Sequence, residues 1–338
     1  MTALMQELRR ALAHHYSMPV RRPHLERMEG RLRRRLQLLQ RLQRHGWRHP
    51  PLDLLHRLRP LLSLAPLDQA LLTSTRQELA ERNAQTLAQL QNALAGGGPT
   101  LALVSCQSRL NRGQKALRAF QPWADAGLGQ PLLVSGDPRL PDWNFRFCPQ
   151  QRWLRLPCSD SYDGLPQKLL TLLWVLALLP AIPTVLKMDD DAHPANPQAL
   201  QALSQHLGND TAAAAGFPIA TATPLCLDRG WHIGKSSRRN NEHPFDSLGT
   251  ERWLSGGTGY LLNGPAVQLL GDFAMHSWGF VQTMLYEDVC VSMLLQAGHS
   301  HFYWLHDPTT LGIFSERQQE IEAGHWQVPS EFIHDKHP

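Results

Sequence analysis

Short apolar runs alternate with helical segments over most of the chain, and this alternation constrains the fold more than any other feature. The stretch at 111–127 has the periodicity of a helix, and it lies between the first two apolar runs. Strands that alternate with helices predict a mainly parallel sheet with helices on both faces, which places the chain in the α/β class. Ligands of such sheets bind at the carboxyl ends of the strands. The predicted strands are 100–106, 130–138, 183–188 and 211–220.

The first part of the chain has a different texture. Leucines recur there at intervals of three and four residues, which predicts helices, and Gly96-Gly97-Gly98 ends the last of them. Residues 1–60 hold fourteen arginines, no lysine and four acids, a net charge of about +10 in a chain whose net charge is +4. We therefore expect a basic, Arg/Leu-rich helical accessory region at 1–96 and an α/β domain at 100–338.

Three interpretations of the basic region remain open. It can be a helical cap packed on the α/β domain, it can dock a partner protein through its leucines, or it can bind a polyanion or an anionic membrane surface. Few aromatic residues are interleaved with the arginines, which weakens the case for nucleic acid. We favour the cap or partner docking, and we expect no specific nucleic-acid partner.

The sequence also predicts where the protein resides. The longest apolar stretch, 169–186, is interrupted by Pro180 and Pro183, and the first residues lack the apolar region of a signal peptide. We therefore expect no transmembrane span, no signal peptide and a cytoplasmic location, with peripheral contact at a membrane left open. The five cysteines form no CxxC pair, which favours free thiols.

Three aspartates, Asp189, Asp190 and Asp191, directly follow the predicted strand 183–188. One interpretation is a solvated acidic loop. The other is a metal site, because carboxylates two residues apart can point to the same side, and Mg²⁺ or Mn²⁺ commonly bridges carboxylates to substrate phosphates. Their position at the end of a strand favours the metal site.

Two later segments also carry candidate chemistry. The run Ser255–Gly259 offers hydroxyls and close backbone approach, although it can also be a tight turn before a helix at 265–271. Glu287 and Asp288 precede an apolar helical run. Helix capping accounts for one of these acids, and the second can serve as a general base.

In this order the segments resemble the β-1,3-glycosyltransferases of glycosyltransferase family 31, the galactosyltransferase and fringe-like group. The resemblance extends over 100–338. The stretch LKMDDDA is similar to the metal-binding DxD motif of that family, and YEDVCV is similar to its EDVYVG segment. The other similar segments are VSCQSRLNRGQKALRAF, DSYDGLPQKLLTLLWVL and WLSGGTGYLLN.

This resemblance implies a GT-A fold, Rossmann-like in its sheet, with a UDP-sugar as donor and Mn²⁺ (or Mg²⁺) as cofactor. Asp191 would be the direct metal ligand together with Asp189. A late histidine often adds a further ligand in the family, for which His334 is the first candidate and His306 the second. The implied reaction is an inverting transfer of a hexose or N-acetylhexosamine to a hydroxyl of a glycan or glycoconjugate, with a β-1,3-type linkage.

The resemblance also implies roles for other residues. Asp288 would be the catalytic base, with Glu287 supporting it or the acceptor. The loop that contacts donor and acceptor would contain Trp253, Ser255, Gly256 and Gly257. The residues expected to bind the nucleotide-sugar are Asp189, Asp190, Arg109, Arg112 and Lys168.

The chain departs from the family pattern at several positions. Thr258 and Ser292 stand where the family motifs have glycine. Animal and plant members usually have an N-terminal membrane anchor, and the basic helical region stands in its place here. That substitution suggests a soluble, bacterial relative.

Other classes of function remain open from the sequence. Paired carboxylates also serve metal-dependent hydrolases of phosphate or glycosidic bonds. A non-catalytic nucleotide-sugar or glycan-binding protein is a second alternative, and a nucleic-acid-binding protein that uses the basic region is a third. The intact acidic segments argue against the non-catalytic protein, and we rank all three below the transferase. The sugar, the acceptor and the oligomeric state cannot be read from the residues.

Overall fold

The computed structural model describes residues 66–220, 225–226, 245–246, 252–276, 278, 281, 284 and 286–315. The helices predicted between residues 1 and 65, and the candidate ligand His334, lie outside the described residues.

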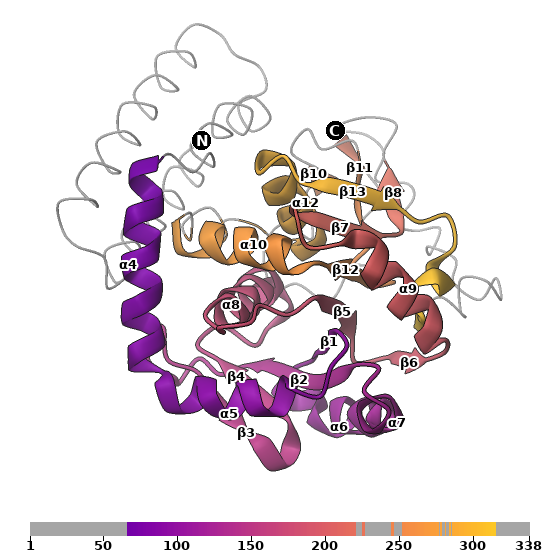
Figure 1. Ribbon diagram of the computed structural model, residues 1–338, viewed down its shortest axis with the longest axis horizontal. Helices are drawn as coiled ribbons and strands as arrows, with labels where there is room; N and C mark the ends of the chain where they lie inside the picture. Colours follow the sequence, from indigo (N-terminus) through magenta and orange to yellow (C-terminus); the bar gives the residue numbers. More distant parts are fainter. Residues whose placement is uncertain are drawn as a thin grey trace, which may run out of the picture.

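A mixed, mostly parallel sheet forms the centre of the fold (Figure 1). In the described part of the chain, eight strands pair in the order β13-β7-β12-β5-β1-β2-β4-β3. Only β12 and the edge strand β3 run antiparallel to their neighbours. The predicted α/β class is thereby confirmed. The strands are β1 (Thr100–Val104), β2 (Gln130–Gly136), β3 (Arg146–Cys148), β4 (Trp153–Leu156), β5 (Val185–Asp189), β7 (Ala213–Gly216), β12 (Tyr260–Leu262) and β13 (His301–Trp304).

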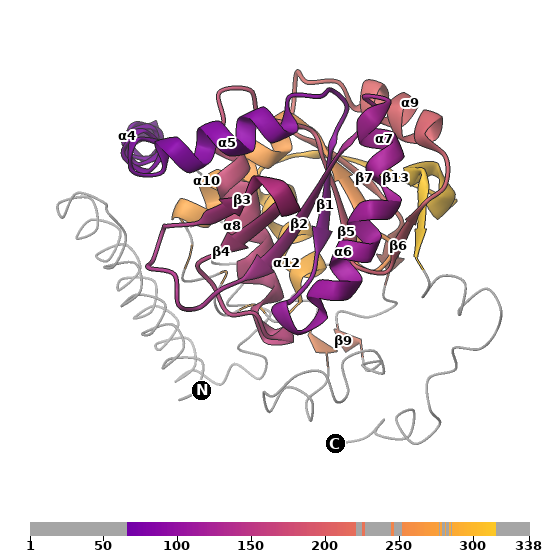
Figure 2. The ribbon, with the colours of Figure 1, turned by 90° about the horizontal axis from the view of Figure 1, so that it is seen from below.

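Helices cover both faces of this sheet, as the view in Figure 2 shows. All five residues of β1 are buried, which is expected of a strand with packing on both sides. Leu101 and Leu103 belong to one apolar cluster, and Ala102 and Val104 belong to the other. The helices of the first cluster are α6 (Leu110–Ala119), α7 (Gln121–Asp125) and α9 (Pro197–Leu207), and those of the second are α8 (Leu165–Ala177), α10 (Gly264–His276) and α12 (Glu287–Ala297).

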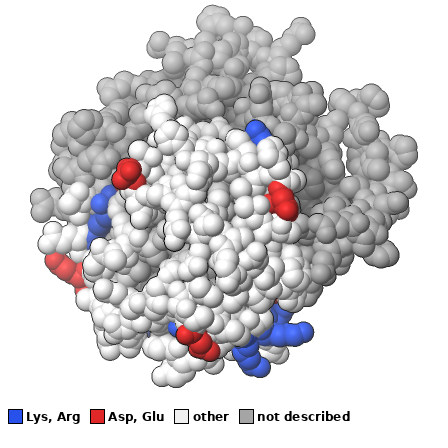
Figure 3. Space-filling view, turned by 45° about the vertical axis from the view of Figure 1, so that its right-hand side comes forward, with Lys and Arg blue, Asp and Glu red and all other residues white. Residues whose placement is uncertain are grey.

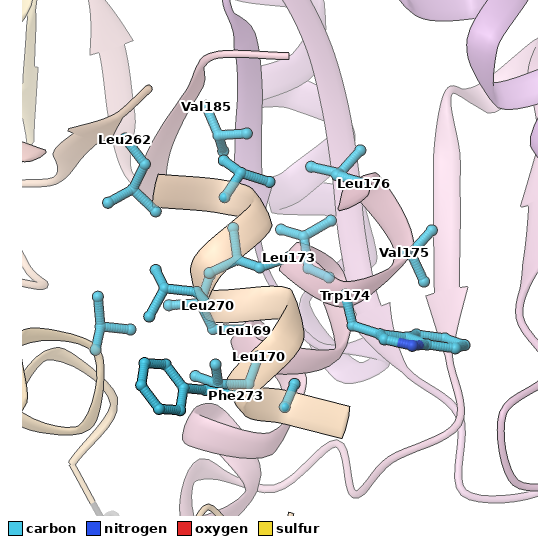
Figure 4. Packing of buried hydrophobic residues seen from close by; sticks show 14 of the residues in the cluster. Leu169, Leu170, Leu173, Trp174, Val175, Leu176, Val185, Leu262, Leu270 and Phe273 are labelled. Carbon is cyan, nitrogen blue, oxygen red and sulfur yellow. The ribbon is translucent and has the colours of Figure 1, made fainter. Parts of the chain in front are cut away.

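Helix α8 is the core of the second cluster. Its residues from Lys168 to Ala177 are all buried. In Figure 4, Leu169 and Leu173 lie on the side of Leu270 of α10, whereas Trp174 points away from that helix and packs against Trp143 and Phe145. A helix that is apolar on every side belongs inside a protein, and this explains the long apolar stretch of the sequence. Within the residues that the structure describes, no helix has both the length and the apolar character needed to cross a membrane. Cytoplasmic location stays a prediction.

The described end of the accessory region packs on the α/β domain. It forms α4 (Pro66–Arg82) and α5 (Ala84–Leu94), and Leu79 and Leu90 are fully buried in the same cluster as α8. The Arg76 guanidinium pairs with Asp272 of α10. The leucines of this part therefore cover the core. Residues 1–60, which hold the fourteen arginines, lie outside the described residues, so the three interpretations of the basic region stay open.

Two predicted elements differ in the structure. The helical pattern before the triple glycine forms two helices, α4 and α5, separated at Asn83, whose amide donates to the carbonyls of Leu79 and Trp143. The single strand expected at 211–220 is wrong, because β7 ends at Gly216 and a separate strand, β8 (Pro218–Ala220), follows. Pro218 has no N–H for the main sheet, and β8 instead pairs with β11 (Arg252–Leu254).

Short elements complete the described structure. Strand β14 (Ile313–Ser315) pairs with β6 (Ala192–Pro194), and β9 (Leu225–Cys226) pairs with β10 (Phe245–Asp246). The 3₁₀ turns are η2 (Gln107–Arg109), η3 (Pro149–Gln151), η4 (Tyr162–Gly164) and η6 (Pro308–Leu311).

Charged side chains are few and scattered on the face of the molecule in Figure 3. Lysines and arginines there do not form a continuous basic patch among the residues shown in white, blue and red.

The packing of α5 can be tested with neighbouring residues. Leu90→Ala should lower the free energy of unfolding by about 2–5 kcal/mol, because Leu90 is fully buried in the main cluster. Gln89→Ala, on the exposed side of the same helix, should change it by about 0.5 kcal/mol or less. Urea denaturation measures both. Equal, small effects would show that the accessory helices are not part of the core.

Candidate active site

The sheet topology brings the acidic and glycine segments to one edge. Strands β1, β2 and β5 are parallel, so their carboxyl ends lie at the same edge of the sheet. Strand β12 runs the other way and begins at this edge, where Tyr260 pairs with Lys187 of β5. The loop Ser255–Gly259 therefore lies beside the aspartates, and the first turn of α12 joins them through contacts to Gly256 and Tyr260.

The three aspartates have different environments. Asp190 is 7% exposed, and its Oδ2 accepts a hydrogen bond of 2.7 Å from the Ser105 hydroxyl. Asp189 is 41% exposed and Asp191 is 21% exposed. The Arg112 guanidinium lies 3.6 Å from Asp190 and 3.8 Å from Asp191. Asp190 is thus held by the protein itself, whereas Asp189 and Asp191 are more accessible to a ligand.

The donor set at Asp191 fits a divalent cation. Its Oδ1 is buried and has no hydrogen-bond partner. Burial and the neighbouring carboxylate of Asp189 raise the pKa of Asp191 to about 6, against the opposing effect of Arg112. A buried carboxylate oxygen without a partner, next to a second carboxylate, is chemistry that Mn²⁺ or Mg²⁺ would satisfy.

Of the two histidines predicted as metal ligands, the structure describes only His306. Among the described residues, no group of three His, Cys, Asp or Glu side chains converges as a ready metal site. His306 is exposed after the end of β13 and belongs to no such group, and His334 lies outside the described residues. The candidate metal ligands among the described residues are therefore the carboxylates of Asp189 and Asp191.

Lys187 connects the aspartates to the other side of the site. Its ammonium group lies 2.9 Å from Asp189 Oδ1 and 2.7 Å from Glu287 Oε1, and it donates to the Gly256 carbonyl at 2.8 Å. We call this set of contacts the Lys187 bridge. Burial acts to lower the pKa of Lys187, but Asp189 and Glu287 outweigh it and the net shift is upward. Sequence reasoning missed this residue, although a lysine inside a buried strand is an anomaly that could have drawn attention to it.

The two acids of α12 have separate tasks. Glu287 is 7% exposed, and its oxygens accept from the Lys187 ammonium and, at 2.7 Å, from the Tyr260 hydroxyl. Asp288 is partly exposed and accepts from the backbone N–H groups of Gly256 at 3.2 Å and Val289 at 2.9 Å. Both carboxylate oxygens of Glu287 therefore have protein partners, whereas Asp288 is exposed enough for a substrate to contact it.

The pKa of Asp288 suits proton transfer near neutral pH. Burial raises it to about 7, and the negative charge of Glu287 adds to the rise. The N–H of Gly256, the Lys187 ammonium and the N–H of Val289 partly oppose this shift. A carboxyl group with a pKa near the working pH is an effective general base.

The glycine loop admits no side chain at its centre. A Cβ at Gly256 would lie 2.4 Å from Glu287 Oε1, and one at Gly259 would lie 2.8 Å from the Lys187 carbonyl. Gly259 also has a positive φ of 86°. Ser255 is buried, whereas Gly257 is partly exposed. Close packing around the Lys187 bridge, as well as turn geometry, requires these glycines.

Trp253 lies in the core. It is 1% exposed, within β11, and belongs to the apolar cluster around α8. Ser292, which stands where the family has a glycine, is fully buried, and its hydroxyl accepts from the N–H of Leu254 at 3.0 Å. This departure from the family pattern therefore attaches α12 to β11.

Of the predicted nucleotide-binding residues outside the aspartates, Arg112 lies closest to them. Arg109 is exposed at the end of η2. Lys168 is 2% exposed, and its ammonium contacts Asp160 at 2.8 Å and the Ser105 carbonyl at 2.7 Å.

Asp160 completes this second buried pair. It accepts from the N–H groups of Gly136 at 2.7 Å and Gln107 at 2.5 Å. Together, Asp160 and Lys168 connect the segment after β1 to the end of β2.

The fold and the family comparison together indicate a class of enzyme. The mixed, mostly parallel sheet with helices on both faces is consistent with a GT-A-like α/β fold. The family model described as Galactosyltransferase matches residues 153–303, and by this match the protein is a glycosyltransferase. The family implies a nucleotide-sugar donor and a glycan acceptor.

The matched region contains all three segments that form the site. It runs from β4 to β13 and includes Asp189–Asp191, the loop Ser255–Gly259 and Glu287-Asp288. Arg109 and Arg112 precede it, so their roles rest on the structure and the sequence motif alone. No curated protein matches the chain.

The raised pKa of Asp288 makes a prediction about stability. Its pKa rises from an ordinary 3.8 to about 7 in the fold, so the ionised form destabilises the protein. The resulting loss in the free energy of unfolding grows as the pH rises from 3.8 to about 7 and stays constant at higher pH. It reaches on the order of a few kcal/mol. Asp288→Asn removes it, and the Tm of the variant relative to wild type should be higher at pH 8 than at pH 5. Thermal melts with a chelator present measure this difference, and an equal difference at both pH values would contradict it.

Proposed function

We propose that this protein transfers a hexose or N-acetylhexosamine from a UDP-sugar to a hydroxyl group of a glycan or glycoconjugate, with inversion and a β-1,3-type linkage. The observation that carries the proposal is the pairing of two unlike acidic centres at one sheet edge. Asp191 has an unpartnered buried oxygen that suits a cation, and Asp288 is partly exposed with a pKa of about 7.

The protein residues divide the reaction between them. Asp288 accepts the proton of the acceptor hydroxyl while the acceptor oxygen forms its bond to the anomeric carbon of the donor. The bond from that carbon to the diphosphate breaks in the same step, and the nucleoside diphosphate leaves with the electron pair. A single in-line displacement of this kind converts an α-linked donor into a β-linked product.

The surrounding groups hold Asp288 and the diphosphate in place. The N–H groups of Gly256 and Val289 orient the Asp288 carboxylate, and Glu287 raises its basicity. Asp191 and Asp189 would hold Mn²⁺ or Mg²⁺, which neutralises charge on a departing diphosphate when it is bound. Arg112, 40% exposed beside these aspartates, supports the same leaving group.

The first test removes the base. Asp288→Asn should lower the rate of transfer by about 10²–10⁴-fold, because a positioned general base contributes that much. Binding of UDP should remain, since Asp288 lies on the side of the site away from the aspartates. Product analysis with UDP-sugars and glycan acceptors measures transfer, and calorimetry measures UDP binding. Asp210→Asn, an exposed aspartate, is the matched control and should transfer at the wild-type rate.

The outcome separates the transferase from its alternatives. Transfer that persists in Asp288→Asn would contradict the assignment of the base. Release of free sugar at the same rate with and without acceptor would indicate a hydrolase instead. Binding of UDP-sugars without either product would indicate a non-catalytic binding protein.

The second test concerns the metal. Asp191→Ala should remove most of the increase in UDP affinity that Mn²⁺ produces, because it deletes the oxygen that has no protein partner. Titration calorimetry with and without Mn²⁺ measures this difference directly. Asp125→Ala, on the exposed side of α7, serves as the control. A variant that keeps the full Mn²⁺ effect would exclude Asp191 as a ligand.

A further inference from the structure

Two lysines in the described part of the chain are buried, and they have different surroundings. Lys168 contacts one carboxylate, that of Asp160. Lys187 contacts two, those of Asp189 and Glu287, and the Gly256 carbonyl as well. A buried ammonium needs a partner to offset its lost hydration, and one carboxylate neutralises it. The second carboxylate at Lys187 exceeds what charge balance requires.

The partners of Lys187 come from three separate segments. Asp189 ends β5, Gly256 lies in the loop before β12, and Glu287 begins α12. Lys187 also lies over the ring of Tyr260, 5.7 Å from its centroid, and the hydroxyl of that tyrosine donates to Glu287. One ammonium group therefore holds three segments that are remote in the chain.

The peptide groups of Gly256 connect this bridge to the base. The Gly256 carbonyl accepts from Lys187, and its N–H donates to Asp288. Both polar groups of a single glycine are fixed, one by the buried cation and the other by the proposed base. A shift of the Lys187 ammonium would therefore turn the residue that orients Asp288.

We propose that Lys187 is a positioning residue that couples the two halves of the active site: Asp189 on the donor side, and Gly256, Glu287 and Asp288 on the acceptor side. This role rests on the proposed function. Lys187 touches no reacting atom, and it acts through the carboxylates and the loop. Its position between the two halves makes their geometry interdependent, so that ordering of one side orders the other.

A double-mutant cycle tests the coupling without any activity measurement. Asp189→Asn and Glu287→Gln are combined, and the unfolding equilibrium constant is measured in urea with a chelator present. Both side chains share one ammonium group. The change in the unfolding equilibrium constant of the double variant should therefore differ by about tenfold from the product of the changes in the two single variants. The same cycle in a Lys187→Met background should be additive.

Lys168→Met supplies the matched background. It removes the other buried lysine, whose partner Asp160 is separate from the Lys187 bridge, and the coupling between Asp189 and Glu287 should persist in it. Coupling that survives in Lys187→Met, or that is absent from the wild-type background, would overturn the proposal.

Kinetics then distinguish positioning from a purely structural role. Lys187→Met should lower kcat by about 10²-fold and move the apparent pKa of the pH–rate profile upward, since the Lys187 charge acts to lower the pKa of Asp288. Lys187→Arg should return this pKa toward the wild-type value and leave kcat low, because its larger head restores the charge without the geometry. An unchanged pH profile in Lys187→Met would overturn the proposal. A wild-type protein that transfers no sugar would refute the proposed function instead, and the unfolding cycle would still decide the coupling.

Discussion

The active site depends on one buried positive charge beneath several negative ones. Five carboxylates gather at a single sheet edge, Asp189, Asp190, Asp191, Glu287 and Asp288. Burial, and then the neighbouring negative charges, raise the pKa values of Asp191 and Asp288. Lys187 is the cation among them that water does not reach. Its positive charge offsets part of the repulsion among these carboxylates, and its contacts with Asp189, Glu287 and the Gly256 carbonyl hold their positions. Arg112, which is more exposed, balances only the outer aspartates.

The antiparallel strand β12 makes this arrangement possible. In an all-parallel sheet, the segment before each strand lies at the opposite edge from the ligand site. Because β12 is reversed, the loop that precedes it lies at the carboxyl edge, directly beside β5. The Gly256 carbonyl can then reach Lys187, and α12 closes the other side through Glu287. The glycines of the loop are required because Glu287 leaves no room for a Cβ at Gly256 and the Lys187 carbonyl leaves none at Gly259.

The sequence allowed much of this to be predicted. Alternating apolar runs predicted β1, β2 and β5, and the acids at 189–191 and 287–288 could be located from their positions beside a strand and before a helix. The pairing of β12 could not be predicted, because three residues give no periodicity and their direction is set by tertiary packing. Trp253 was expected in a ligand loop and lies in the core, because its motif includes a strand that packs on α12. Lys187 escaped notice since its partners are 2, 69 and 100 positions away.

The raised pKa that suits Asp288 to its proposed role as a base also weakens the fold locally. A carboxyl group with a pKa near 7 is one whose ionised form the protein disfavours, so ionisation of Asp288 costs stability. Two apolar clusters, one on each face of the sheet, stabilise the chain against this cost. Lys187 limits the cost, since its charge opposes the rise in the pKa of Asp288 while Glu287 promotes it. The balance between these two neighbours sets the basicity of Asp288, and for that reason the cation belongs to the working site as much as to the fold.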